Sequence, residues 1–260
     1  MHLYGLNLDE LIRWWPNGSL FSRLRFFEGA QLSPNFRRRA ELAENACFWM
    51  GTSYKWLNLP SLLSSITHEI EPRSIPGAIN YFTAPVQPSL ATRGIQSKHA
   101  QDTYLRALKA SGVNVYLGRH RLDHRKAPRF VSRDSPADRS NQVDIWHLEE
   151  KETDVRISIA MYQLAAQQHC MGGEQVEQLV LVSGDTDMTP ALEAIRADFP
   201  YLRIGIILPH RKGLEDRAAG SLKKNSDWMR NSISTDELSA HQFPERVPTR
   251  KKPAIKPDYW

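Results

Sequence analysis

The chain has 260 residues, of which 41% are hydrophobic, and this is enough for one large domain. No apolar run approaches the roughly 20 residues that a membrane helix needs, and two cysteines in unrelated contexts exclude a disulfide framework. Charged residues near the N-terminus, Asp9, Glu10 and Arg13, exclude a secretory signal, so we expect a cytoplasmic protein without a membrane partner. The net charge of +5 fits a nucleic-acid partner and fits equally a basic surface without one.

The pattern along the chain divides it into three parts. Residues 1–45 show no buried-strand pattern and are expected to be an atypical N-terminal region. The pattern becomes regular from about residue 46, and a domain is expected over 46–240. Residues 241–260 combine prolines with lysines and arginines, which predicts an extended tail without a core of its own, although its last aromatic residues, Tyr259 and Trp260, could dock on the domain.

Within the domain, strands alternate with helices. Short apolar runs predict strands at 78–82, 113–117, 178–183 and 202–208, and helical spacing predicts helices at 59–66, 98–110, 153–168 and from Thr189. Val155, Ile159 and Tyr162 share one face of the third helix. This alternation predicts parallel βαβ units in a doubly wound α/β sheet. Residues 119–142 are polar and basic and are expected to form an exposed loop, with His120 and His124 as a solvated pair.

Two carboxylates follow the 178–183 strand at once, in the segment Ser183-Gly-Asp-Thr-Asp187. Gly184 permits a tight exit from the strand, and open α/β folds bind ligands at this edge of the sheet. Asp185 and Asp187 repel each other unless a cation lies between them, and oxygen ligands suit Mg²⁺ or Mn²⁺. A plainer interpretation is that Asp187 caps the next helix while Asp185 is a solvated turn residue.

A second acidic candidate is Asp154, in the charged segment that opens the 153–168 helix. Asp154 could be a third carboxylate at the same sheet edge, and Lys151 could then contact a phosphate. Alternatively, Asp154 only complements the helix dipole and the charges form a solvated face.

Together the two acidic segments resemble the NYN domain, a PIN-like nuclease group that includes LabA-type proteins. Glu-Glu-Lys-Glu-Thr-Asp-Val at 149–155 is followed about thirty residues later by Leu-Val-Ser-Gly-Asp-Thr-Asp-Met at 181–188. Segments 51–58, 81–83 and 112–118 are similar to further parts of this family, and the resemblance covers roughly residues 46–260. It implies a three-layer α/β/α sandwich with a mainly parallel, PIN-like sheet, and a metal-dependent ribonuclease site.

The resemblance assigns roles to individual residues. Asp154, Asp185 and Asp187 would be catalytic residues and metal ligands, and Ser183 and Thr186 would steady the site. A fourth acidic residue should come from an Asp-Gly-x-Asn motif after the first strand, which this sequence lacks. Two replacements for this motif stay open. One is Glu41 or Glu44, which precede Gly51. The other is the segment Gly5-Leu-Asn-Leu8, with Tyr4 in place of the Asp.

We therefore expect an endoribonuclease that uses Mg²⁺ or Mn²⁺ and acts on RNA, with single-stranded RNA favoured. The expected RNA-binding residues are Lys151, Ser183, Thr186, Arg119 and Arg121. The sequence leaves a homo-oligomer open. Two alternatives remain. One is a degenerate NYN domain that binds RNA or protein without cleaving. The other is a haloacid-dehalogenase-type phosphatase, because the segment Asp185-Thr-Asp-Met-Thr189 resembles the nucleophile motif of that family.

Overall fold

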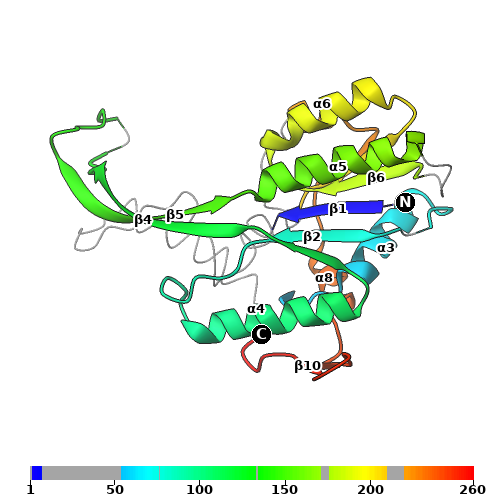
Figure 1. The fold of residues 1–260 in the computed structure, drawn as a ribbon, viewed down its shortest axis with the longest axis horizontal. Helices are drawn as coiled ribbons and strands as arrows, with labels where there is room; N and C mark the ends of the chain where they lie inside the picture. Colours follow the sequence, from blue (N-terminus) through cyan, green and yellow to red (C-terminus); the bar gives the residue numbers. More distant parts are fainter. Residues whose placement is uncertain (1, 8–53, 76, 133, 171–175, 210–219) are drawn as a thin grey trace.

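The centre of the molecule is a six-stranded sheet in which every neighbouring pair of strands is parallel. The computed structural model describes residues 2–7, 54–75, 77–132, 134–170, 176–209 and 220–260 (Figure 1). The strand order is β3-β2-β1-β6-β7-β8. The strands are β1 (His2–Asn7), β2 (Ile79–Thr83), β3 (Asn114–Leu117), β6 (Gln178–Val182), β7 (Arg203–Ile207) and β8 (Trp228–Arg230).

Helices cover both faces of this sheet, which confirms the predicted α/β class (Figure 1). One face packs against α3 (Leu59–Ile70) and α4 (Ile95–Ala110), and the other against α5 (Thr153–Cys170) and α6 (Thr189–Asp198). Alternate residues of each buried strand point into the two cores. Val180 joins the first core, for example, and Leu179 and Leu181 join the second. None of the described helices is long and apolar enough to cross a membrane.

Local sequence signals explain where α3 and α4 begin and end. The Asn58 side chain accepts a hydrogen bond from the Ser61 amide at 3.3 Å, and Pro60 occupies the first turn of α3. Helix α4 stops at Ser111, and Gly112 follows with a φ of +90°, a conformation in which glycine has no steric cost. Both helices then present apolar side chains to the sheet at helical spacing.

Helix α5 packs through a different face from the expected one. Val155 and Ile159 are 62% and 51% exposed, and Tyr162 is also exposed. The side chains that contact the sheet are those of Ile157, Met161, Leu164 and Ala165. Both sets have helical spacing, so periodicity alone could not choose between them.

Residues 119–142, expected as an exposed loop, instead form most of a long antiparallel hairpin. Its strands are β4 (Arg119–Pro128) and β5 (Gln142–Lys151), and they pair along their full length from Arg119↔Lys151 to Pro128↔Gln142. We call this hairpin the arm. It extends away from the six-stranded sheet (Figure 1). Charged residues occupy many positions of both strands, which is why the sequence lacked the apolar pattern of a strand.

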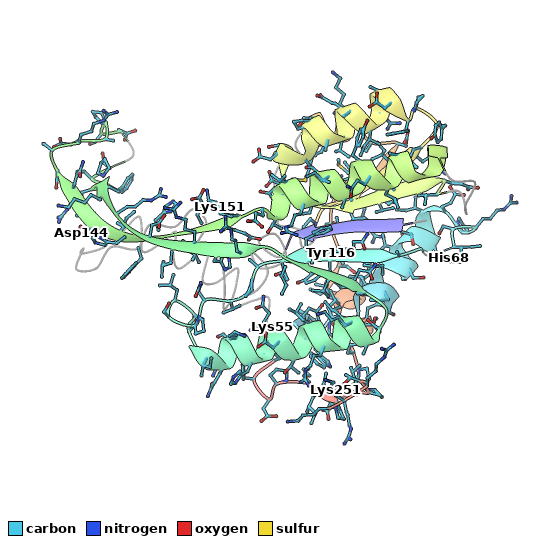
Figure 2. The ribbon with its side chains drawn as sticks, in the orientation of Figure 1. Lys55, His68, Tyr116, Asp144, Lys151 and Lys251 are labelled. Carbon is cyan, nitrogen blue, oxygen red and sulfur yellow. The ribbon has the colours of Figure 1, made fainter. Side chains whose placement is uncertain are left out.

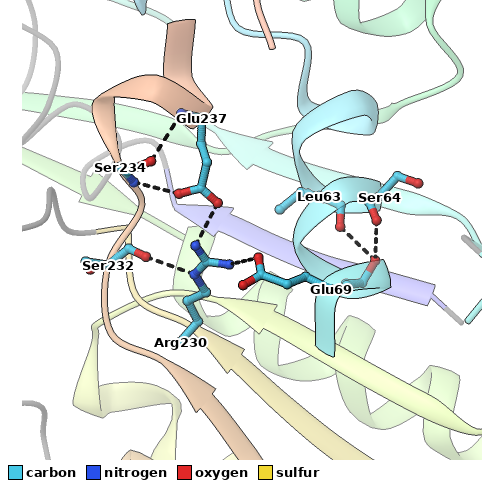
Figure 3. A network of polar contacts seen from close by, with 8 residues as sticks. Leu63, Ser64, Glu69, Arg230, Ser232, Ser234 and Glu237 are labelled. Carbon is cyan, nitrogen blue, oxygen red and sulfur yellow. Dashed lines mark hydrogen bonds and ion pairs between the residues drawn. The ribbon is translucent and has the colours of Figure 1, made fainter. Parts of the chain in front are cut away.

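A 3-10 turn, η2 (Thr186–Met188), lies between β6 and α6. After β7, α7 (Gly220–Lys224) packs on the second face, and the chain then returns to the first face with α8 (Thr235–Ala240), β9 (Arg246–Val247) and β10 (Ala254–Ile255). Arg230 ties three elements together (Figure 3). Its guanidinium lies 2.7 Å from Glu69 of α3 and 2.7 Å from Glu237 of α8. Glu237 also completes a capping box with Ser234.

Residues 241–260, expected to be an extended tail without a core of its own, pack into the first core of the domain. Phe243, Val247, Ala254 and Trp260 are all buried in the first core. Docking of the two terminal aromatics is confirmed, because the Tyr259 hydroxyl donates to the Gln96 carbonyl at 3.0 Å and the Trp260 ring lies 6.2 Å from that of Trp56.

The domain also includes residues before the expected boundary at residue 45. His2–Asn7, placed by the sequence in an atypical N-terminal region, forms β1 between β2 and β6 at the middle of the sheet. Residues 8–53, including Glu41 and Glu44, lie outside the described part of the chain.

Candidate functional site

The candidate site lies at the edge where the parallel strands end. β1 runs beside β6 with Leu6 opposite Val182, and beside β2 with Asn7 opposite Phe82. The segment Gly5-Leu-Asn7 therefore finishes at the same edge as the turn that begins with Ser183. Gly5-Leu-Asn7 belongs to one of the two replacements considered for the missing first motif, and the other, Glu41 or Glu44, lies outside the described residues.

Ser183 organises the acidic turn after β6. Its side chain is buried, and its amide donates to the carbonyl of Ile207 at 3.1 Å. The Ser183 hydroxyl accepts the amide of Asp185 at 3.0 Å. Asp185 Oδ1 in turn accepts the amide of Asp187 at 2.9 Å and caps η2. The capping role thus falls on Asp185, whereas the plainer interpretation of the sequence gave it to Asp187.

The Asp187 side chain is exposed and that of Asp185 half-buried, so a ligand can reach this turn. Thr186 between them is exposed. Thr189 is the first residue of α6, and its hydroxyl is hydrogen-bonded to that of Ser221 at 3.1 Å. The cap position of α6 is taken by Met188, without a side-chain hydrogen bond.

Helix α5 brings Asp154 to the same edge. Asp154 lies in its first turn, and Ser158, one turn later on the same face, has its hydroxyl 3.8 Å from the sulfur of Met188 in η2. The Asp154 face of α5 therefore packs beside the turn that carries Asp185 and Asp187. Within the described residues, however, no group of three or more His, Cys, Asp or Glu side chains is close enough to hold a metal ion.

The cations expected to bind RNA lie near the base of the arm, which is the end where Arg119 of β4 pairs with Lys151 of β5. Each of these cations pairs with a carboxylate. Arg119 Nε lies 2.7 Å from Glu152, Arg121 Nε lies 3.0 Å from Asp123, and the Lys151 ammonium contacts Glu149. Figure 2 shows Lys151 at this base and Asp144 toward the far end of the arm.

These ion pairs lower the pKa values of two carboxylates at the base of the arm, Glu149 and Glu152. A hydrogen bond from Arg156, with the charge of Arg119, lowers the pKa of Glu152. Hydrogen bonding to Lys151 lowers the pKa of Glu149 in the same way. The base of the arm is consequently a charge-balanced surface rather than a strip of unpaired cations.

Sequence reasoning missed one buried polar group beside this surface. His120, expected to be solvated, has a side chain that is only 8% exposed, and it faces Glu150 across the two strands. The two residues lie thirty positions apart, so only the pairing of β4 with β5 brings them together. The one available signal was the alternation of His120 and Leu122 with Arg119 and Arg121, which has the period of a strand.

The fold and the edge geometry agree with the comparison to known families. The NYN domain profile matches residues 94–227, which include α4, the arm, Asp154 and the Ser183–Asp187 turn. The chain belongs to the NYN domain family.

One relative and one solved structure are similar to this NYN chain. The relative is "6-hydroxy-3-succinoylpyridine 3-monooxygenase HspA" of Pseudomonas putida, which is 34% identical over 227 residues, a match that covers 81% of this chain and 70% of that protein. The solved structure is a protein of unknown function from Vibrio parahaemolyticus, 15% identical, with a TM-score of 0.36 over 68% of this chain and 78% of that one. So low a TM-score carries no argument about function.

Proposed function

We propose that this NYN chain is a metal-dependent endoribonuclease, built on a three-layer PIN-like sandwich, that hydrolyses RNA at the carboxyl edge of its sheet. The observation that carries the proposal is the turn after β6. The Ser183 hydroxyl and two amides hold Asp185 and Asp187 there, beside the Asp154 face of α5. Family membership supports a nuclease-like fold for this edge.

The carboxylates present suit one kind of metal site. Mg²⁺ keeps several of its waters and is commonly bound by one or two carboxylates together with substrate phosphates. Asp185 and Asp187 can supply those carboxylates, with Asp154 as a third, and their oxygen-only chemistry fits Mg²⁺ or Mn²⁺. The lack of a three-residue cage among the described residues therefore fits an ion that the scissile phosphate helps to hold.

When bound, such an ion activates a water molecule and stabilises negative charge on the transferring phosphoryl group. The protein's own groups fix the geometry. Ser183 sets the position of Asp185, and the Asp187 amide fixes one oxygen of the Asp185 carboxylate. Because Asp187 is exposed, a phosphodiester can reach its carboxylate from solvent.

RNA binding would come from the base of the arm. Arg119, Arg121 and Lys151 pair with carboxylates, but each of the three side chains is more than one third exposed. Exposed ion pairs contribute only about 0–1 kcal/mol, so a phosphate of single-stranded RNA can compete for these cations. We expect Arg119 and Lys151 to contribute more to RNA binding than the more remote Arg121, because they lie where the arm joins the sheet.

The test is cleavage of labelled single-stranded RNA in Mn²⁺ by the wild type and by the variants Asp185→Asn, Asp187→Asn and Asp154→Asn. We expect each variant to lose most activity while keeping its melting temperature. Asp258→Asn removes an exposed carboxylate from the tail and is the matched control, which should cleave like the wild type. A folded wild type that binds RNA without cleaving it would show the degenerate binding module instead.

The 34% identical relative favours a second candidate, an oxygenase that acts on a hydroxylated pyridine. Tyr4 at the first-motif position also departs from the expected nuclease pattern. A monooxygenase must take two electrons from a reductant for each O₂ it consumes. Oxygen uptake should therefore be measured with 6-hydroxy-3-succinoylpyridine and a reduced nicotinamide cofactor. Substrate-dependent uptake without RNA cleavage would establish this candidate and remove the first.

A further inference from the structure

The two faces of the arm differ in exposure along its outer half. In a hairpin, directly opposed residues share a face, and successive residues of a strand alternate between the faces. On one face, Ala127 and Ile145 are 4% and 3% exposed. The other face, which we call the open face, carries four exposed residues, His124, Lys126, Asp144 and Trp146.

Trp146 presents a large aromatic ring on the open face. The residue is 49% exposed, whereas tryptophan is on average a highly buried residue. The residue directly opposite on β4 is His124, and the two rings lie 5.9 Å apart with their planes at 68°. An exposed aromatic ring on a strand pair is the kind of surface on which the bases of single-stranded RNA stack.

The cations of the outer half differ from those at the base of the arm. Lys126 and Arg129 are exposed, and within the described part of the chain neither forms an ion pair with a carboxylate. Lys126 lies opposite Asp144, but the Asp144 carboxylate contacts His124, with Oδ1 3.3 Å from Nε2. Figure 2 labels Asp144 on this part of the arm. A phosphate that binds Lys126 therefore displaces no existing ion pair.

We propose that the open face binds single-stranded RNA outside the acidic edge, with one base stacked on Trp146 and a phosphate on Lys126. The two residues are diagonal neighbours on the same face, a separation of about 7–8 Å, so the flexible Lys126 side chain can reach the phosphate of a base on the indole. Trp146 lies on β5 about 17 Å from Lys151 at the base, so an RNA held at the edge reaches it several nucleotides away.

Charge favours RNA over a peptide as the ligand. The strand of Lys126, β4, carries four cations, at positions 119, 121, 125 and 126, against one carboxylate, Asp123. The exposed carboxylate of Asp144 on the open face should repel an RNA phosphate, whereas it would attract a cationic peptide. Replacing Asp144 therefore distinguishes the two ligands. The inference rests on the proposed function, because that proposal makes single-stranded RNA the substrate.

The test is the affinity of the full chain for a fluorescently labelled single-stranded RNA, measured by anisotropy in EDTA so that no cleavage occurs. Trp146→Ala should weaken binding by about 5- to 100-fold, and Trp146→Phe, which keeps a ring, should restore most of it. Tyr201→Ala removes an aromatic ring that is 55% exposed and lies before β7, outside the arm. It is the matched control and should bind like the wild type.

Two charge variants test the same site independently of the ring. Lys126→Gln should reduce the slope of the logarithm of affinity against the logarithm of salt concentration by about 0.7, the value for one phosphate contact with a single strand. Asp144→Asn should tighten binding. Both measurements remain decisive if Trp146→Ala alters the fold of the arm.

The site would be overturned by a wild type that binds no RNA, by a folded Trp146→Ala variant that binds like the wild type, by an unchanged salt slope in Lys126→Gln, or by weaker binding in Asp144→Asn. The proposed function fails separately. A wild type that binds RNA through Trp146 but does not cleave it in Mn²⁺ removes the nuclease and keeps the arm site. Cleavage by the wild type with normal binding by Trp146→Ala does the reverse.

Discussion

Lys55 is a buried cation in the first core. Its side chain is 3% exposed, and its ammonium lies 5.9 Å from the ring centre of Trp260. Burial, and to a smaller extent the charge of Arg93, lower the pKa of Lys55 from 10.5 to about 8. Between these two pH values the unfolded chain holds this proton while the folded chain has released it. The free energy of unfolding that depends on Lys55 therefore rises as pH rises from about 8 to 10.5.

Replacing Lys55 with methionine should stabilise the fold at neutral pH, because the folded state no longer buries a charge. The gain over the wild type should shrink between pH 8 and 10.5, where the wild type loses its proton on folding. Urea unfolding of both proteins at pH 7 and pH 10 measures this difference. Lys251→Met changes an exposed lysine and should show no such pH dependence. A gain equal at both pH values would contradict the account.

The residues of the candidate site were predictable to unequal degrees. Ser183, Asp185 and Asp187 follow one strand within five positions, so local sequence was enough to place them together. His120 and Glu150 meet only because β4 pairs with β5, and a charged hairpin carries little periodicity. The ion pair of Arg119 with Glu152 has the same origin, whereas Arg121 pairs with Asp123 two positions along its own strand.

Among the elements, α5 shows how a helix with two apolar faces resists prediction. Ile157 is 1% exposed and packs against the sheet, whereas Ile159, two positions later, is 51% exposed on the outer face. An α-helix has 3.6 residues per turn, so two residues that are two positions apart point to nearly opposite sides. The tertiary position of the sheet selects the face, and that information is not local.

The two isoleucines give a matched pair of substitutions. Ile157→Ala removes buried methyl groups and leaves a cavity, so it should lower the free energy of unfolding by about 2–4 kcal/mol. Ile159→Ala makes the same chemical change at the exposed face and should cost less than about 0.5 kcal/mol. Chemical denaturation of the two variants measures both values. Equal losses would mean that the outer face of α5 is buried in solution.

At the scale of the whole molecule, the two ends of the chain complete the fold. β1 occupies the middle of the sheet, and the last residues close the first core. Trp56 joins the C-terminal part through its indole N–H, which donates to the carbonyl of Pro244 at 2.7 Å. The rings of Phe243 and Trp260 lie 5.8 Å and 6.2 Å from that of Trp56. The tail is therefore a structural part of the domain.

Trp260→Ala should destabilise the whole domain although it changes the last residue. The indole is 8% exposed and contacts Trp56 and Tyr104, so its loss should cost about 3 kcal/mol. Thermal unfolding followed by circular dichroism measures the change. Ile255→Ala, at an exposed position of β10, is the control and should leave the Tm nearly unchanged. A Trp260→Ala variant as stable as the wild type would show that the tail does not support the core.

The sequence predicted most strands of the sheet and the helices between them, but not β1, the pairing of the arm or the packing of the tail. Strands β2, β3, β6 and β7 and the helices between them carry apolar periodicity and turn residues, so their places and the α/β class followed from local rules. β1 was missed because its six residues are separated from the next described element by residues 8–53. The tail was missed because proline-rich composition describes an isolated segment, whereas these residues fold against helices far away in the sequence.

We propose that the carboxylates of the edge and the scissile phosphate hold one metal ion jointly. The most direct test is single-turnover cleavage of an RNA with sulfur in place of a non-bridging oxygen of the scissile phosphate. Mg²⁺ binds sulfur poorly and Mn²⁺ binds it better. The account predicts slow cleavage of this RNA in Mg²⁺ and recovery in Mn²⁺, with the unmodified RNA cleaved in both. Equal rates on the two RNAs in Mg²⁺, or no cleavage of the unmodified RNA by the folded protein, would contradict it.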